Sequence, residues 1–329
     1  MEKSKGLIGF RQYFKSSHSQ EDLLQIIRES QNYKNLGFDF MVALCGENPY
    51  SLLAENNMEK MVNVYDYARL RLTPTQLIKR FIPEYHNGRE VKIIYYSNFP
   101  EGLTYPIDLF SAMSSFMNYD HLAVSDSDFQ IPFEEIIRSF KYHIKNSNQH
   151  SPSLTFPNRV RRSLDAHNYP INRWAMEDIE NLYVYFLSNI KFLDMKLDIQ
   201  SGLFFTNRLA NILLDFNKVG KWVGTLHLAI SLLREKNVLV NRVDVQTANQ
   251  HESTINFGVQ CDKIDELYDY YLIPMENIIR ISLDNPRKYL MSDWCENFSI
   301  AEIKAILENI YQEYLKHKHP ALETTKLSV

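Results

Sequence analysis

The sequence predicts an α/β protein, in which helices flank a mainly parallel mixed sheet and a helical extension follows at the C-terminus. Short apolar runs alternate with helical patterns through the first half of the chain, as they do in βαβ units. At 329 residues the chain exceeds the usual size of one domain. From about Asp262 onward the pattern is helical to the end. We therefore expect a sheet domain over residues 1–260 and a helical extension over residues 261–329.

Each predicted strand is a short apolar run, and the segments between the strands carry apolar residues at helical spacing. The expected strands cover residues 7–10, 38–44, 91–96, 121–124 and 238–245, with a further apolar run at 203–205. The first expected helix opens with a capping-box-like segment at 19–22. The other expected helices cover about 52–70, 74–81, 107–117, 133–144, 177–190, the residues after 205 up to about 216, and 226–236. The polar segment 145–174 contains three prolines and is the most loop-like part of the chain.

A closing amphipathic helix is expected near the C-terminus, where Ile300, Ile303, Ile306, Leu307 and Ile310 mark one face. Basic residues near its end complement the helix dipole. We expect this helix to pack within the chain or to form a homodimer contact.

Composition and charge exclude several classes of protein. A formal net charge of -4 offers no basic surface of the kind that nucleic-acid binding needs. No segment reaches about 18 apolar residues, the length of a membrane span, and the N-terminus lacks the apolar core of a signal peptide. Cys45, Cys261 and Cys295 are too scattered for a disulfide framework or a zinc site. We expect a cytoplasmic protein, with a peripheral membrane contact left open.

Polar side chains follow three of the predicted strands. Glu47 follows the second strand, Asn98 the third, and Asp126 and Asp128 the fourth. Because ligands of open α/β sheets bind beyond the carboxyl ends of the strands, these side chains are expected to line one polar cleft. Carboxylates spaced i and i+2 point to the same side of an extended backbone and can share one hard cation, such as Mg²⁺ or Mn²⁺, with substrate phosphates. An Asp-Ser-Asp turn that caps the next helix is the open alternative.

The order of elements around this carboxylate pair resembles the nucleotide-binding half of glycosyltransferases of the GT-A fold. The passage YPIDLFSAMSSFMNYDHLAVSDSDFQIP reads as a helix, an apolar strand ending in Asp-x-Asp, a turn and a new helix. LDIQSGLFFTNR, at 197–208, is similar to the D-x-Q-x-G segment of family-2 enzymes. Residues 221–245 look like the helix with a leading tryptophan, and its exit strand, that follow in those enzymes. The resemblance covers roughly residues 5–255.

Two departures from the family pattern affect what the resemblance implies. The acidic residue usually expected on the Trp222 helix is absent, with Thr225 and Leu226 near that place. The R-x-x-R-W type of motif of processive synthases is missing as well, which fits an enzyme that adds a single sugar.

The resemblance implies a donor that is bound through a metal ion. Asp126 would lie near the ribose and sugar of the donor, and Asp128 would bind the metal that bridges the diphosphate. His251 falls where some members, notably mannosylglycerate synthase, place a third ligand; a solvated histidine is the alternative. Glu47 resembles the acidic residue that often contacts the nucleoside, or else it belongs to a turn. Asn98 completes the expected donor-binding set.

The acceptor side is less defined in the sequence. Asp198 is the candidate catalytic residue: it would act as a general base or hold donor-sugar hydroxyls, or else it caps the turn at Gly202. Arg161 and Arg162 belong to an arginine cluster, between positions 159 and 173, that could bind an anionic acceptor or form a solvated loop face. Trp222 could stack on a sugar or be a core residue.

The predicted function is therefore metal-dependent transfer of one sugar by a hexosyltransferase, from a GDP- or UDP-sugar to a small-molecule or glycan acceptor. Sugar-phosphate nucleotidyltransfer is disfavoured, because LIGFRQYFKSS lacks the glycine-rich loop that binds a triphosphate in such enzymes. A non-catalytic GT-A-like binding protein is the third hypothesis, suggested by the missing acidic residue near Thr225. The donor base, the acceptor and the stereochemistry stay open.

Overall fold

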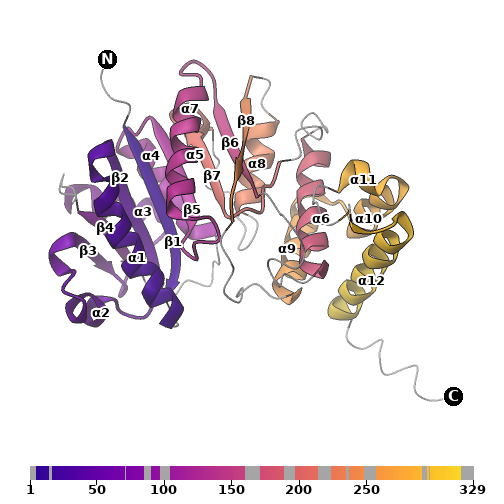
Figure 1. Ribbon diagram of the computed structural model, residues 1–329, viewed down its shortest axis with the longest axis horizontal. Helices are drawn as coiled ribbons and strands as arrows, with labels where there is room; N and C mark the ends of the chain where they lie inside the picture. The colour runs from indigo at the N-terminus through magenta and orange to yellow at the C-terminus, as the bar shows by residue number, and fades with distance from the viewer. Residues whose placement is uncertain are drawn as a thin grey trace.

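In the computed structural model, a central sheet lies beside a helical bundle (Figure 1). The structure describes residues 5–14, 17–70, 72–84, 90–96, 104–159, 171–188, 197–213, 224–234, 237–247, 257–290, 295 and 297–319.

In the described part of the chain, eight strands form one sheet in the order β3-β4-β2-β1-β5-β7-β6-β8. The strands are β1 (Gly6–Phe14), β2 (Phe38–Gly46), β3 (Val62–Tyr67), β4 (Val91–Tyr96), β5 (His121–Asp126), β6 (Ser153–Arg159), β7 (Leu203–Asn207) and β8 (Leu239–Val245). The first five strands run parallel; β7 is antiparallel to β5 and β6, and β6 is parallel to β8. The predicted fold class, a mainly parallel mixed sheet flanked by helices, is confirmed.

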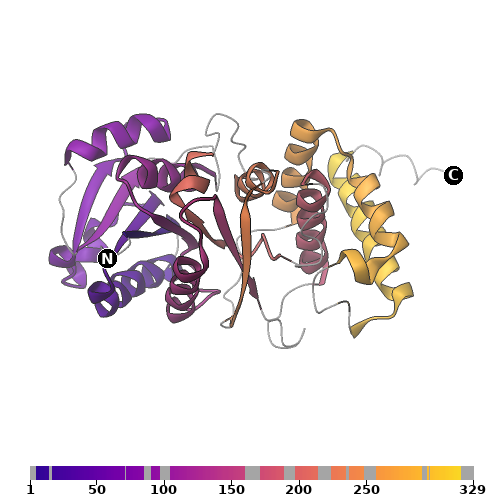
Figure 2. The same ribbon diagram turned by 90° about the horizontal axis from the view of Figure 1, so that it is seen from above.

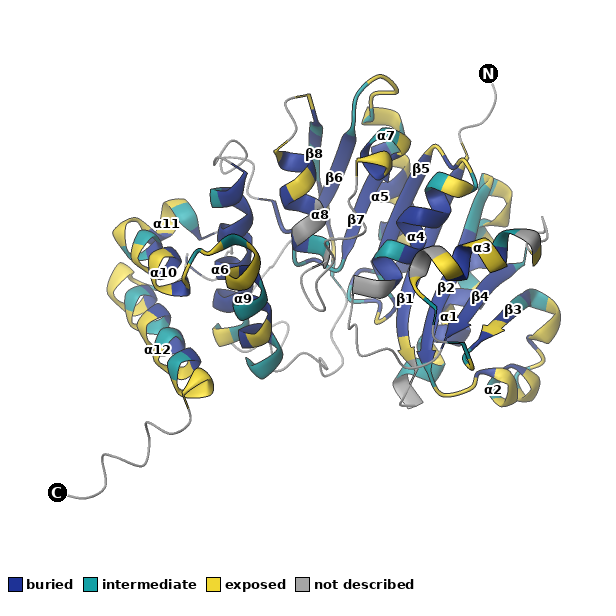
Figure 3. Ribbon diagram, turned by 180° about the vertical axis from the view of Figure 1, so that it is seen from behind, coloured by how far each residue is buried: buried dark blue, intermediate teal, exposed yellow. Residues whose placement is uncertain are grey.

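The direction of winding reverses between β1 and β5. The chain leaves β1 for β2 on one side and later returns to β5 on the other. Helices α1 (Ser17–Tyr33) and α5 (Phe133–Asn146) cover one face of the sheet, while α3 (Pro74–Glu84) and α4 (Thr104–Phe116) cover the opposite face (Figures 1 and 3). Ligands of open α/β sheets bind at such a switch point, beyond the carboxyl ends of the strands.

The helical bundle lies beyond the edge strand β8 (Figure 2). At its centre is α6 (Ile171–Leu187), which is buried on nearly every side and packs against α8, α9, α10 and α12. The core on the α4 face of the sheet continues into this bundle, from Phe110 through Trp174 to Leu307. The remaining helices are α2 (Tyr50–Glu55), α7 (Arg208–Ile212), α8 (Gly224–Leu233), α9 (Phe257–Tyr271), α10 (Met275–Asp284), α11 (Pro286–Tyr289), α12 (Ile300–Lys318) and the 3-10 turns at Lys34–Leu36 and Glu59–Met61. A domain boundary after residue 260 stays a prediction.

Two strands contradict the sequence-based prediction. The expected helix over 52–70 ends early, because Asn57 adopts a left-handed φ of 55°, and the chain then forms β3. The expected loop over 145–174 contains β6 and the first turn of α6. Pro157 is tolerated in β6 because pairing with the antiparallel neighbour β7 stops at Thr155.

The starts of the first and the last helix can be compared with the expected helix caps. Helix α1 begins at Ser17, so Ser19 and the acidic residues after it lie inside the helix, not at its cap. Ser299 caps α12 through a reciprocal capping box with Glu302. The buried face of α12 packs on α6, α9 and α10, and a homodimer contact therefore stays a prediction. None of the described helices is long and apolar enough to cross a bilayer.

Two histidines are buried between α5 and the sheet. His143 is fully buried, and its Nδ1 lies 2.8 Å from Thr155 Oγ1. Its ring meets that of His121 edge-on, with 5.3 Å between the ring centroids. Burial, reinforced by His121, lowers the pKa of His143 from 6.5 to about 3. Burial lowers the pKa of His121 as well.

Mild acid is expected to destabilise the fold through His143. Above pH 6.5 the imidazole is neutral whether the chain is folded or unfolded. Below that pH the unfolded chain takes up a proton that the folded state does not accept until about pH 3, so stability falls as the pH drops through this window. Between pH 7.5 and pH 5 the contribution of His143 to the free energy of unfolding should fall by about 2 kcal/mol, at about 1.4 kcal/mol per pH unit below 6.5, and this contribution is measured as the difference between the wild type and His143→Gln.

Urea unfolding at the two pH values measures this loss. His143→Gln should lose less stability on acidification than the wild type. His150→Gln, at an exposed loop position, serves as the control and should behave like the wild type. Equal losses in all three proteins would exclude His143 as the source.

Candidate active site

The carboxyl end of β5 meets the turn at Gly202. The N–H of Asp126 donates to the Gly202 carbonyl at 2.9 Å. Gly202 has a φ of +73°, and a Cβ there would lie 2.3 Å from Asp126 Oδ2. Only glycine fits this backbone at this distance from the carboxylate. Two segments singled out separately in the sequence, Asp-x-Asp and D-x-Q-x-G, are thus in direct contact.

Strand β1 contributes a buried arginine to the same place. Arg11 is the register partner of Asp126, and its Nε donates to Asp126 Oδ1. The Arg11 side chain is 7% exposed and that of Asp126 is 36% exposed. This ion pair therefore joins β1 to β5 at the switch point of the sheet.

The turn after β5 positions Asp128 through a residue with an unusual backbone conformation. Phe129 has a φ of +48°, which is uncommon for a residue other than glycine. Its ring packs against Phe10 and Phe133, with centroids 6.3 and 6.2 Å away. The N–H of Gln130 then donates to Asp128 Oδ1 at 3.2 Å. Aromatic packing therefore holds the turn that carries Asp128.

Asp128 is an exposed residue of this turn. The loss of solvation, followed by the charge of Asp126, raises its pKa to about 6, against the opposing effects of Arg11 and Arg173. Asp22 of α1 lies near it: burial, then the charge of Asp128, raises the pKa of Asp22 to about 7. Three carboxylates from two parts of the chain therefore interact here through their charges.

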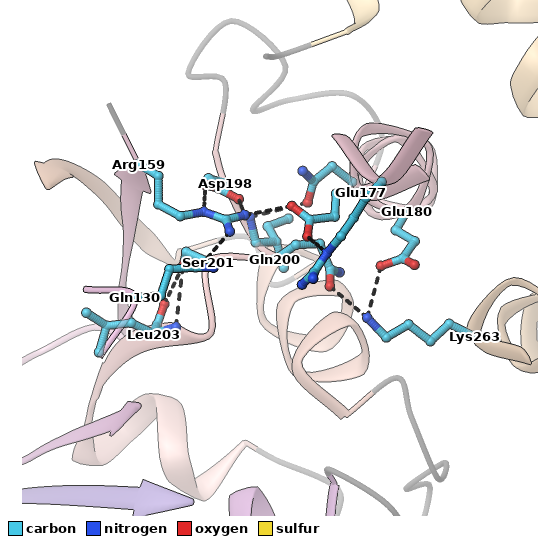
Figure 4. Close-up of polar contacts among 12 residues, drawn as sticks. Gln130, Arg159, Glu177, Glu180, Asp198, Gln200, Ser201, Leu203 and Lys263 are labelled. Carbon is cyan, nitrogen blue, oxygen red and sulfur yellow. Dashed lines mark hydrogen bonds and ion pairs between the residues drawn. The ribbon is translucent and has the colours of Figure 1, made fainter. Parts of the chain in front are cut away.

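A second polar cluster is centred on Arg159, at the end of β6 (Figure 4). Its guanidinium donates to both carboxylate oxygens of Asp198, at 2.7 and 2.9 Å. It also donates to Glu177 Oε2 at 2.8 Å and to Gln130 Oε1 at 2.7 Å. Arg159 is 4% exposed and Asp198 is 3% exposed, so the expected solvated loop face is wrong for Arg159. Because Gln130 also binds Asp128, this cluster is continuous with the carboxylate pair.

Helix α9 adds a buried lysine, Lys263, that points toward Glu180 of α6 and toward Gln200 (Figure 4). Lys263 donates to Glu180 Oε2 at 3.3 Å and to Gln200 Oε1 at 3.2 Å. Burial raises the pKa of Glu180 to about 7 despite the neighbouring lysine. Gln200 lies two residues before Gly202, so the helical bundle contributes directly to holding the segment that touches Asp126.

The predicted site residues are only partly brought together. Asp198 connects to Asp128 through the side chain of Arg159 and then through Gln130, whose side chain accepts from Arg159 and whose backbone N–H donates to Asp128. Glu47 is exposed and directly follows β2. The last residue of β2, Gly46, pairs with Phe14 of β1, whereas Asp126 pairs with Arg11, three residues earlier in β1. Glu47 therefore lies two strands from Asp126 and farther beyond the carboxyl ends of the strands. The predicted residues outside the described part of the chain are Asn98, Arg161, Arg162, Trp222 and His251.

Sequence reasoning missed four residues of this site: Arg11, Asp22, Gln130 and Lys263. Arg11 had a usable signal, because a charged side chain inside the apolar strand LIGFRQYF must find a buried partner. Asp22 was interpreted only as part of a helix start.

The carboxylate oxygens at this edge have the hard-donor chemistry that Mg²⁺ and Mn²⁺ prefer. Among the residues that the structure describes, no group of three or more His, Cys, Asp or Glu is arranged to hold a metal ion. The guanidinium of Arg11 instead supplies a positive charge at Asp126 Oδ1. The described carboxylates therefore supply only part of the ligand set that such a cation needs.

No protein-family model matches the chain, and no curated protein sequence does. Several solved structures are similar to it at low identity. Glucosyl-3-phosphoglycerate synthase from Mycobacterium tuberculosis, in complex with Mn²⁺, UDP and glucosyl-3-phosphoglycerate, is 13% identical with a TM-score of 0.47, over 83% of this chain and 81% of that one. S. aureus TarS is 11% identical with a TM-score of 0.36, over 99% and 76%. A cytidylyltransferase from Leptospira borgpetersenii is 8% identical with a TM-score of 0.32, over 88% and 98%.

Proposed function

We propose that the chain is a GT-A-type glycosyltransferase that moves one sugar from a nucleotide-diphosphate donor to an acceptor hydroxyl. The observation that carries the proposal is the contact between Asp126 and Gly202 at the switch point of the sheet. The fold binds ligands at this place, and the two motifs that suggested sugar transfer meet there.

Asp126 and Asp128 would hold the donor diphosphate through a divalent ion, Mn²⁺ or Mg²⁺, with His251 as the predicted third ligand. Such an ion neutralises charge on the leaving diphosphate. With a pKa of about 6, Asp128 is mostly ionised at neutral pH and so available as a ligand. The outer donor residues, Glu47 and Asn98, remain proposed contacts to the nucleoside side.

Asp198 is better suited to positioning than to proton transfer. Arg159 engages both of its carboxylate oxygens, so Asp198 would have to leave that ion pair before it could accept a proton. We assign it the role of fixing the segment between β6 and Gly202. Arg161, Arg162 and Trp222 are retained as proposed acceptor contacts.

The three cysteines are buried and widely scattered along the chain, which fits a reducing compartment, and we propose a cytoplasmic location. Residues 1–260 would supply the donor and acceptor sites. Lys263 of the following helices supports them through Gln200.

Asp128→Asn is expected to abolish the metal-dependent part of donor binding, at least tenfold in affinity, because a neutral amide is a poor ligand for a hard cation. The measurement is binding and hydrolysis of GDP- and UDP-sugars with and without Mn²⁺. Asp284→Asn, at an exposed position of α10, is the matched control. Failure of the wild type to bind or turn over any nucleotide sugar would refute the proposed function. Equal Mn²⁺ dependence in Asp128→Asn and the wild type would refute the role of Asp128.

A further inference from the structure

Arg11 and the Gly202 turn each contact one oxygen of the Asp126 carboxylate. Asp126 Oδ2 lies against Gly202, so closely that a Cβ there would be 2.3 Å away. Asp126 Oδ1 accepts from Arg11 Nε. A divalent ion that approaches Asp126 therefore meets a carboxylate that is already engaged by a cation at Oδ1.

Two cations bound to one carboxylate oxygen repel each other, and this repulsion is strong where solvent is partly excluded. Arg11 is 7% exposed, so water does not screen its charge effectively. Its position is fixed by the parallel pairing of β1 with β5, which makes Arg11 and Asp126 register partners. Arg11 thus weakens cation binding by the free protein, unless the guanidinium finds another partner.

We propose that the Arg11 guanidinium competes with the divalent ion for Asp126. Arg11 leaves Asp126 when a nucleotide diphosphate binds. This inference rests on the proposed function for the identity of the nucleotide. Guanidinium groups bind phosphate oxygens with two parallel hydrogen bonds, so a diphosphate offers Arg11 a replacement for Asp126. The ion and the nucleotide then strengthen each other's binding, and by linkage the factor is the same in both directions.

The test is a titration with Mn²⁺ in which the free ion is followed by electron paramagnetic resonance. Without nucleotide, Arg11→Met should bind Mn²⁺ about tenfold more tightly than the wild type, because the competing charge is gone and the apolar stem remains. Arg11→Lys keeps the charge and should bind Mn²⁺ as weakly as the wild type. Arg138→Met removes an exposed arginine of α5 and is the control for loss of net charge. If Arg11 only stabilised the fold, Arg11→Met should bind Mn²⁺ more weakly than the wild type, not more tightly.

Repeating the titration with UDP or GDP separates the inference from the proposed function. In the wild type the nucleotide should tighten Mn²⁺ binding about tenfold or more, and in Arg11→Met this gain should largely vanish. Mn²⁺ affinity in Arg11→Met that equals the wild-type value, or is lower, would overturn the competition. No effect of any nucleotide on the wild type would overturn the proposed function, whereas tighter Mn²⁺ binding by Arg11→Met would still support the competition. Arg11→Gln, which keeps a polar group in the strand, gives the same readout if Arg11→Met does not fold.

Discussion

Replacing Gly202 by alanine is expected to lower kcat/KM for sugar transfer about a hundredfold, because a misplacement of about 1 Å at a reacting site has an effect of that order. The new Cβ would lie 2.3 Å from Asp126 Oδ2 and 3.1 Å from Asp126 Cγ. Asp126 must then move, and its contacts to Arg11 and to the Gly202 carbonyl move with it. The φ of +73° adds a backbone cost of about 1 kcal/mol for alanine.

The matched control for this substitution is Gly37→Ala. Gly37 also has a positive φ, 81°, but it lies directly before β2, at the amino ends of the parallel strands and away from Asp126. Both variants share the backbone cost, and only Gly202→Ala displaces Asp126. Thermal unfolding and kcat/KM, measured on both proteins, separate the two effects. A loss of activity in Gly202→Ala no greater than that in Gly37→Ala would mean that Asp126 is not part of the reaction site.

The central strands could be predicted from the sequence because burial on both faces leaves a continuous apolar run. LIGF, FMVAL and VKIIYY each form a strand as expected. Strand β3, VNVYDY, lies at the edge and alternates polar with apolar residues, so its pattern merged with that of the preceding short helix. Strand β6 carries Pro157 and is flanked by polar segments, and local turn signals outweighed its short apolar stretch.

The candidate site was predictable only where its chemistry is local in the sequence. Asp126 and Asp128 stand two residues apart, and a ligand-binding turn after a strand is a local pattern. The partners of these residues come from pairings that periodicity does not encode: Arg11 is 115 residues from Asp126, and Arg159 is 39 residues from Asp198. Which strand lies beside β5 is decided by the topology of the sheet, not by any segment alone.

Arg159→Met is expected to destabilise the fold by about 3–5 kcal/mol, the usual consequence of removing one partner of a buried ion pair. Asp198 and Glu177 are 3% and 4% exposed; Asp198 would lose two charge-assisted hydrogen bonds and Glu177 would lose one. The charge of Arg173, whose Nε lies 3.3 Å from Glu177 Oε1, remains beside that carboxylate. Arg242→Met is the matched control: its ion pair with Asp244 is exposed, and its loss should change stability by less than about 1 kcal/mol.

The origin of this destabilisation can be separated from simple loss of packing. If uncompensated charge is the cause, neutralising the partners in Arg159→Met with Asp198→Asn and Glu177→Gln should recover part of the lost stability, although more hydrogen-bonding groups have been altered. The ring of Trp174 lies 5.9 Å from the guanidinium carbon of Arg159. If the lost packing against this ring is the cause, the triple variant should be less stable than Arg159→Met. Urea unfolding of the three proteins decides between these outcomes. Recovery would show that the cluster joining β6, α6 and the Asp128 turn is maintained by balanced charge, so that one arginine sets the geometry of both halves of the site.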